Sequence, residues 1–359
     1  MRSTPLPVLH GRGTSVNPAN RFEPIEVVPD GDALDAELAE HGEIASPRTR
    51  YLRDTTKTIL AHNDSPDIGF DYSINPYRGC EHGCVYCYAR PGHEYFGLSA
   101  GLDFESVIFV KPDAAALLRS ALLKKSWQPQ VIAISGVTDC YQPVERKLRI
   151  TRGVLEVLRD FRNPVTLITK NHLITRDLDI LGELATWNGV AVSISITTLR
   201  NDLQRVMEPR TSTPARRLQA VQALARAGVP VNVMVAPVVP GLTDEELPAI
   251  LRAAADAGAR SAGYITLRLP FAVKELFERW LEDHFPERKE KVLNRVRGMR
   301  DGKLYQSKWG TRMRGEGVFA DQLELLFDAT CRKLGLNGER RPPLDTGHFR
   351  RPGEQLALL

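Results

Sequence analysis

From Asp71 onward the chain alternates short apolar runs with amphipathic segments, and this rhythm constrains its fold more than any other sequence feature. The apolar runs are rich in β-branched residues and are predicted strands at 71–75, 131–136, 165–170, 190–197, 231–237 and 262–268. The segments between them are predicted helices at 114–125, 145–161, 176–187, 214–227 and 244–257. Strands that alternate with helices form right-handed crossovers and a parallel sheet. The sequence therefore predicts an α/β fold.

Six parallel strands suit either an open doubly wound sheet or a partial (β/α)6 barrel, and periodicity alone does not choose between them. The flanking regions differ from the core in composition. Residues 1–68 are rich in Pro, Gly and Asn and are predicted to form a partly irregular N-terminal extension. We expect the core domain at 69–270 and a mostly helical, basic C-terminal region at 271–359.

The predicted strand at 190–197 has two unlike faces. Val190, Val192, Ile194 and Ile196 alternate with a smaller and more polar set, namely Ala191, Ser193, Ser195 and Thr197. Period two places the first set against the helices and the second on the opposite face. A strand buried between two apolar layers would be apolar on both faces. The polar row therefore predicts either a cavity for a charged ligand or a water-filled barrel mouth.

Composition indicates a cytoplasmic protein with no membrane partner. No run approaches the roughly 18 apolar residues of a membrane helix, and the N-terminus lacks the apolar core of a signal peptide. The chain has only five cysteines, an odd number, which favours a reducing compartment.

The net charge of +4 is unevenly distributed. Between Arg288 and Arg314 the chain has ten lysines and arginines against Glu290 and Asp301, with Tyr305 and Trp309 among them. Such a segment is typical of a nucleic-acid surface. It is equally typical of a solvated helix followed by a basic loop.

Three of the five cysteines, Cys80, Cys84 and Cys87, are spaced C-x3-C-x2-C. Three thiolates on one short loop can hold three corners of an iron–sulfur cube. An ordinary electron-transfer [4Fe–4S] cluster takes four cysteines, so three leave one iron open for chemistry. The motif therefore predicts an enzyme.

Two other interpretations of the triplet remain open. A zinc site needs four ligands in tetrahedral array, for which His82 or His93 would supply the fourth. The spacing lacks the paired C-x2-C motifs of zinc ribbons. The second alternative is three unconnected structural thiols.

With Tyr86 between the second and third cysteines, the motif resembles the C-x3-C-x-aromatic-C signature of the radical SAM superfamily. The resemblance implies a partial (β/α)6 barrel whose cysteine loop follows the first strand. It also implies that the open iron of a [4Fe–4S] cluster binds S-adenosylmethionine. Reductive cleavage would then give a 5′-deoxyadenosyl radical that abstracts hydrogen from a substrate, with electrons from a flavodoxin- or ferredoxin-type donor.

In barrels of this kind the active site forms where the strands end at their carboxyl edge. That rule selects several candidates for cofactor binding: Ser135, Lys170, Ser193, Ser195, Glu208 and Ala236. A lysine suits the carboxylate of S-adenosylmethionine, so we assign Lys170 to it. The alternative for Lys170 is an ordinary pair with a surface carboxylate.

The run Thr138–Glu145, with Glu208-Pro-Arg210, resembles the radical SAM branch related to spore photoproduct lyase. That resemblance implies cofactor contacts from Lys170 and from a serine of the fourth strand, Ser193 or Ser195. The tyrosines of the cysteine motif, Tyr86 and Tyr88, are further expected contacts.

Cys140 departs from the proline that we expect in this run. It is a candidate thiyl hydrogen donor or, more simply, a tolerated substitution. Cys331 lies on an amphipathic segment and is expected to pack.

The substrate is left open. The basic segment and the lyase resemblance suggest nucleic acid, with chemistry like DNA lesion repair. A protein or a small metabolite would use the same core. A regulatory module that binds zinc or an iron–sulfur cluster without turnover is the alternative from another class.

Overall fold

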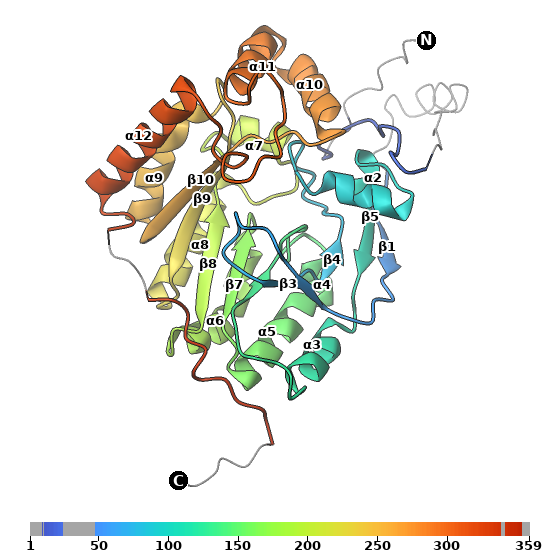
Figure 1. Ribbon diagram of the computed structural model, residues 1–359, viewed down its shortest axis with the longest axis vertical. Helices are drawn as coiled ribbons and strands as arrows, with labels where there is room; N and C mark the ends of the chain where they lie inside the picture. Colours follow the sequence, from blue (N-terminus) through green and yellow to red (C-terminus); the bar gives the residue numbers. More distant parts are fainter. Residues whose placement is uncertain (1–8, 10, 24–46, 339–341, 354–359) are drawn as a thin grey trace.

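The six predicted strands lie side by side in one sheet (Figure 1). The computed structural model describes residues 9, 11–23, 47–338 and 342–353. The six strands are β3 (Tyr72–Ile74), β6 (Ile132–Ile134), β7 (Val165–Thr169), β8 (Val190–Ser195), β9 (Val231–Val238) and β10 (Ser261–Thr266). All five pairings between them are parallel.

Strand order decides between the two expected architectures. In the part of the chain that the structure describes, the order is β10-β9-β8-β7-β6-β3-β2, so these strands follow one another without reversal. A doubly wound sheet reverses its strand order at a switch point, and this sheet has none. The described ends of the sheet, β10 and β2 (Leu60–His62), do not pair with each other. The fold is therefore a partial barrel, as the resemblance implied.

Helices cover the outer face of the sheet, close to where the sequence predicts them. They are α3 (Ala114–Leu122), α5 (Ile150–Phe161), α6 (Leu178–Ala185), α8 (Pro214–Arg226) and α9 (Leu247–Asp256). The segment expected as one helix at 145–161 is broken at Arg149, which has φ 53°, so a short α4 (Glu145–Leu148) precedes α5. A single hydrophobic core joins these helices to the strands.

The alternation predicted for β8 is confirmed. Val190, Val192 and Ile194 are fully buried in the core shared with the helices. On the other face, Ser193 accepts a hydrogen bond from Asn232 of β9, at 3.1 Å. The polar row thus faces the interior of the barrel, where it meets polar groups of the neighbouring strands.

The last part of the predicted N-terminal extension, residues 47–68, is less irregular than its composition suggests; residues 1–8, 10 and 24–46 of that extension lie outside the described ranges. β1 (Arg50–Arg53) pairs in parallel with β5 (Val107–Val110), and β2 is the antiparallel edge strand of the main sheet. Both strands are short and mostly exposed, so they lack the apolar alternation by which strands are recognised.

The C-terminal region supplies the sixth barrel helix after an insertion. α10 (Val273–His284) and α11 (Lys289–Gly298) follow β10 and pack over the cysteine loop. α12 (Val318–Leu334) then lies alongside α9 (Figure 1). Phe327 packs on Tyr264 of β10 with ring centroids 4.8 Å apart, and Cys331 is buried in the same core.

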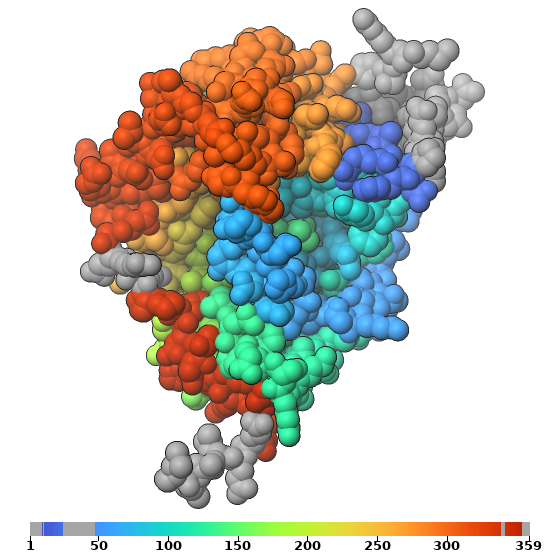
Figure 2. All heavy atoms as spheres, viewed as in Figure 1, coloured from blue at the N-terminus to red at the C-terminus, as the bar shows by residue number. Residues whose placement is uncertain are grey.

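Loops cover the exposed edge of β10. The peptide N–H of Thr266 donates to the carbonyl of Met313 at 2.9 Å. Asn337 pairs with both backbone groups of Ala262, at 2.9 and 3.0 Å. Arg312 then pairs with Asp67, in the loop after β2, at 2.6 Å. Figure 2 shows the loop that contains Arg312 in contact with the loop after β2 on one face of the molecule.

Among the described helices, none has the length and apolar character to cross a membrane.

Candidate functional site

The three motif cysteines lie on a turn that follows β3 and β4 (Tyr77–Arg78). Residues 79–90 are called the cysteine loop below. Cys80 and Cys84 are buried, Cys87 is partly exposed, and all three are free thiols. Burial raises the pKa of each of the three thiols. Buried thiols of this kind ionise when a bound cation compensates the charge, as metal coordination does.

The surroundings of the thiols fit a [4Fe–4S] cluster better than a zinc ion. Both histidines expected as a fourth zinc ligand are engaged elsewhere: His82 Nδ1 lies 3.2 Å from Asp139 Oδ2, and His93 Nε2 lies 2.8 Å from the carbonyl of Val107. Burial also lowers the pKa of His93 to about 4. Among the described residues, no three His, Cys, Asp or Glu side chains converge on a single-ion site. A cube does not need such convergence, because each thiolate binds a different iron.

A buried arginine holds the backbone of the cysteine loop. Arg90 donates from Nε to the carbonyl of Cys84 at 2.9 Å and from Nη2 to the carbonyl of Gly83 at 3.1 Å. Glu105 balances its charge at 2.6 Å, and both side chains are fully buried. Gly83 has φ 67°, and a Cβ there would lie 2.5 Å from the Glu105 carboxylate. The shape of the loop therefore depends on residues outside the cysteine motif.

The N-terminal segment packs against the same turn. The peptide N–H of Gly13 donates to the Glu105 carboxylate at 2.8 Å, and Arg12 donates to the Glu105 carbonyl at 2.9 Å. A Cβ on Gly13 would lie 1.6 Å from the carbonyl oxygen of Gly83. Only glycine allows so close an approach of two backbones.

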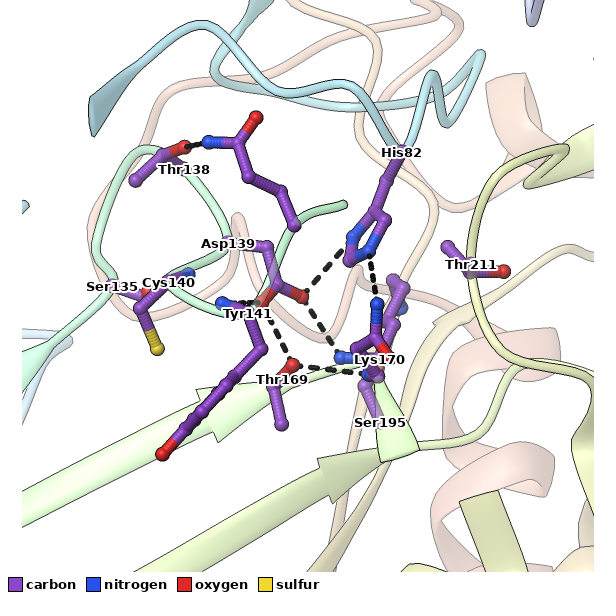
Figure 3. Close-up of polar contacts among 12 residues, drawn as sticks. His82, Ser135, Thr138, Asp139, Cys140, Tyr141, Thr169, Lys170, Ser195 and Thr211 are labelled. Atoms are coloured by element: carbon purple, nitrogen blue, oxygen red, sulfur yellow. Dashed lines mark hydrogen bonds and ion pairs between the residues drawn. The ribbon is translucent and has the colours of Figure 1, made fainter. Parts of the chain in front are cut away.

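The run after β6 ties the cysteine loop to β7, as Figure 3 shows. Asp139 accepts hydrogen bonds from Thr169 Oγ1 at 2.7 Å and from the peptide N–H of Lys170 at 2.9 Å, and it faces His82. Burial alone would raise the pKa of Asp139, but His82 and these hydrogen bonds outweigh it and lower the pKa. Thr138 adds a hydrogen bond to the carbonyl of Gly79 at 2.6 Å.

The carboxylate of Glu208 joins the cysteine loop to the barrel. It is fully buried and accepts hydrogen bonds from the hydroxyls of Tyr86 and Thr197. Arg217 of α8 pairs with one carboxylate oxygen, and Lys170 Nζ lies 3.4 Å from the other. Burial would raise the pKa of Glu208, but Arg217, Lys170 and the two hydroxyls outweigh it and lower the pKa to about 2. This carboxyl group is therefore ionised at neutral pH.

Lys170 lies at the centre of the expected cofactor residues. Its ammonium group donates to Ser195 Oγ at 2.6 Å and to the carbonyl of Ala236 at 3.0 Å. It also lies 5.7 Å from the centroid of the Tyr86 ring. The structure thus brings together Tyr86, Lys170, Ser195, Glu208 and Ala236 beside the cysteine loop.

Four other expected residues lie apart from this group. Ser193 is bonded to Asn232. Ser135 Oγ accepts from the peptide N–H of Cys140 at 2.7 Å, and Cys140 is fully buried in the core shared with the helices. Tyr88 lies at the rim, with 53% of its surface exposed and its hydroxyl bonded to the carbonyl of Gly136.

Sequence reasoning missed the buried arginines that position the site. Arg217 shows what signal was available. The buried face of α8 includes residues 217, 220, 221 and 224, so Arg217 occupies an apolar position of the helical period. A charge at such a position requires a buried partner, and Glu208 is that partner.

Comparison with known proteins gives a family and a fold. The family model described as the Radical SAM superfamily matches residues 74–254, half of the chain. The uncharacterized protein Rv2578c of Mycobacterium tuberculosis (strain ATCC 25618 / H37Rv) is 38% identical over 222 residues. That match covers 61% of this chain and 65% of the relative, so this chain spans less than two thirds of the relative's length. The uncharacterized protein MJ0683 of Methanocaldococcus jannaschii is 26% identical over 228 residues, covering 64% of this chain and 82% of the relative.

Among solved structures, a spore photoproduct lyase mutant aligns with a TM-score of 0.57 and 16% identity, over 86% of this chain and 93% of that chain. Another structure of that lyase, with bound AdoMet and dinucleoside spore photoproduct, aligns with a TM-score of 0.56 over the same shares. At this identity the likeness concerns the fold.

The contact between Gly13 and Gly83 gives a stability prediction. Gly13→Ala forces a methyl group against a backbone carbonyl, so the free energy of unfolding should fall by about 2 kcal/mol, a typical overpacking effect. Gly92→Ala is the matched control, because a Cβ there meets nothing within 4 Å. Urea unfolding of the metal-free proteins measures both. Equal stability of the two variants would contradict the proposed tight contact.

A second prediction concerns Glu208. Glu208→Gln leaves Arg217 and Lys170 without their counter-charge, so the free energy of unfolding at pH 7 should fall by about 3–5 kcal/mol. Asp113→Asn is the control: it removes an exposed ion pair with Arg53 and should change the free energy of unfolding by less than about 1 kcal/mol. Urea unfolding at pH 7 measures both variants.

The loss of unfolding free energy in Glu208→Gln should also depend on pH. The pKa of Glu208 is about 2 in the folded chain against an ordinary value of 4.5, so the unfolded state binds its proton first as the pH falls. The stabilisation is complete above pH 4.5 and is lost toward pH 2. The difference between wild type and Glu208→Gln should therefore shrink as the pH falls through this window. A difference that stays constant would show that the ionised carboxylate is not its cause.

Proposed function

The chain belongs to the radical SAM superfamily and is an enzyme of that class, and on this premise we propose which of its residues hold the cofactors. Enzymes of the family use a [4Fe–4S] cluster and S-adenosylmethionine. In our proposal Cys80, Cys84 and Cys87 bind three irons, and the fourth iron binds S-adenosylmethionine. The observation that carries the proposal is the triplet of free thiols, two of them buried, near two histidines that already contact other groups.

The cofactors, when bound, supply reductive cleavage to a 5′-deoxyadenosyl radical that abstracts hydrogen from the substrate. The chain's own part is to bind, orient and exclude water. α10 and α11 cover Cys84 and Tyr86 with an apolar cluster, which keeps this side of the loop dry. Asp139 holds His82, and Arg90 holds the carbonyls of Gly83 and Cys84, so the backbone between the first two cysteines keeps one arrangement.

Lys170 is proposed to bind the carboxylate of S-adenosylmethionine. Its ammonium group is only partly engaged by a carboxylate, since its contact with Glu208 is 3.4 Å long. A ligand carboxylate would compete with that contact, because Glu208 is also neutralised by Arg217. Ser195 lies with Lys170, whereas Ser193 does not, so we assign the strand serine to Ser195.

The assignment of the thiols is tested by anaerobic reconstitution with iron and sulfide. Wild type should hold about four irons, as a [4Fe–4S] cluster requires, and should form 5′-deoxyadenosine from S-adenosylmethionine under dithionite. Cys80→Ala, Cys84→Ala and Cys87→Ala should each lose both properties. Cys331→Ala is the matched control, because that cysteine belongs to α12, lies buried in the main hydrophobic core and is not part of the cysteine motif.

Two results would contradict the assignment. One is a colourless wild-type protein with a single zinc ion. The other is full 5′-deoxyadenosine formation by any of the three motif variants.

Nucleic acid is the narrower proposal for the substrate. The basic segment supports it less than its composition suggested, since six of the ten cations have acidic partners within 4.0 Å: Arg288, Lys289, Arg295, Lys308, Arg312 and Arg314. Arg300 is buried and bonds the carbonyl of Leu267. Most of this positive charge therefore has an acidic group close by.

Exposed rings give the proposal its support. Tyr88, Phe271 and Trp309 are each about half exposed. The guanidinium of Arg268 lies 5.7 Å from the Tyr88 centroid, and that of Arg312 lies 3.8 Å from the Trp309 centroid. Aromatic rings beside arginines stack the bases of single strands. The lyase that shares this fold has been seen with a dinucleoside photoproduct, which agrees with the same proposal.

Fluorescence anisotropy with a labelled single-stranded oligonucleotide tests whether the protein binds nucleic acid. Binding should weaken as salt rises, and Tyr88→Ala should weaken it about tenfold, the effect of one lost stacking contact. Leu325→Ala, at an exposed position of α12, should leave it unchanged. Absence of binding at low salt would exclude nucleic acid and favour a protein or a small metabolite as substrate.

A further inference from the structure

A basic pocket lies among the helices outside the barrel. It has a volume of about 300 Å³ and is lined by residues of α4, of the turn η2 (His172–Asp177) and of the N-terminal end of α8. Arg146, Arg176 and Arg216 line it together with polar side chains, and no Asp or Glu does.

Two of the three arginines carry uncompensated charge. Arg176 is neutralised by the buried carboxylates of Glu145 and Asp177, at 2.8 Å each. Arg146 and Arg216 are exposed, and within the described ranges neither has an acidic partner; Arg216 only donates to Gln219 at 3.1 Å. The pocket therefore presents a net positive surface to solvent.

The wall of this pocket touches the cysteine loop. Asn171, a lining residue, has its Nδ2 3.2 Å from His82 Nε2. Ser212, just before α8, donates to Asn171 Oδ1 at 3.0 Å. His82 lies in the chain between Cys80 and Cys84. One hydrogen-bonded layer thus separates the pocket from the loop that carries the thiols.

The interior of the barrel lies on the other side of the same strand end. Lys170 points inward to Ser195, whereas its neighbour Asn171 lines the outer pocket. A molecule in the pocket therefore approaches the cysteine loop without entering the space assigned to S-adenosylmethionine and the substrate. Figure 3 shows His82 near the end of β7, beside Lys170.

We propose that this pocket docks the acidic one-electron carrier protein, of flavodoxin type, that reduces the cluster; this rests on the proposed function. Opposite charge accelerates the encounter of two proteins and orients them. In the step itself, one electron leaves the carrier and enters the cluster. The carrier is oxidised and the cluster is reduced by that single electron, and no bond forms or breaks. His82 and Asn171 provide the bonded route between the docking surface and the loop.

The test compares two routes of reduction in the reconstituted holoenzyme. The double variant Arg146→Glu/Arg216→Glu and the control Arg252→Glu/Arg332→Glu, on α9 and α12, receive electrons from a purified photoreduced flavodoxin or from dithionite. Cluster bleaching is followed by stopped-flow absorbance. With flavodoxin at low salt the double variant should be slower by at least about tenfold, within the range of electrostatic steering. With dithionite all proteins should be reduced at the same rate, and the control should match wild type throughout.

Three results would overturn the docking proposal. One is equal reduction of the double variant by flavodoxin, and another is an equal slowing with dithionite. The third is binding of inorganic phosphate that is lost in the variant while reduction by flavodoxin is unchanged, which would mark a small-anion site. Titration calorimetry of flavodoxin against wild type and variant measures docking without a cluster. Failure to assemble the cluster would therefore contradict the proposed function alone.

Discussion

The buried carboxylate of Glu208 is the contact on which the arrangement of the site depends. It accepts hydrogen bonds from Tyr86 of the cysteine loop and from Thr197 after β8, and it pairs with Arg217 of α8 and with Lys170, which follows β7. Four segments distant in sequence thus meet on one group. An ionised carboxylate without water is stable only when its lone pairs are occupied by donors. The position of each donor is therefore coupled to the positions of the others.

A second buried pair, Arg90 with Glu105, acts on the opposite side of the cysteine loop. Buried ion pairs add little net stability compared with apolar residues of the same size, but breaking one leaves an uncompensated charge. Here both pairs also bind the loop, one through the carbonyls of Gly83 and Cys84 and the other through Tyr86. These charged contacts hold a loop that contains two glycines, Gly79 and Gly83.

How much of the fold and of the candidate site could be predicted depends on whether each sequence pattern is local or comes from contacts between distant residues. Period-two and helical patterns are local, so the six strands, their helices and the polar row of β8 were found from the sequence. The edge strands β1 and β2 are short and exposed, and they carry no such pattern. Arg90 and Arg217 reveal their roles only through the residues that tertiary structure brings to them. The sixth barrel helix, α12, was not predicted as part of the barrel, because α10 and α11 separate it from β10 in the chain.

An incomplete barrel exposes the unpaired backbone of its terminal strands, and such an edge is a template for adding a strand from another molecule. On β10 that template is occupied within the chain. Asn337 takes the place of a neighbouring strand's backbone at Ala262, and the carbonyl of Met313 accepts the N–H of Thr266 further along the same edge. The opposite edge, β2, is three residues long and mostly exposed. Neither described edge therefore presents a long template on which copies of the protein would polymerise.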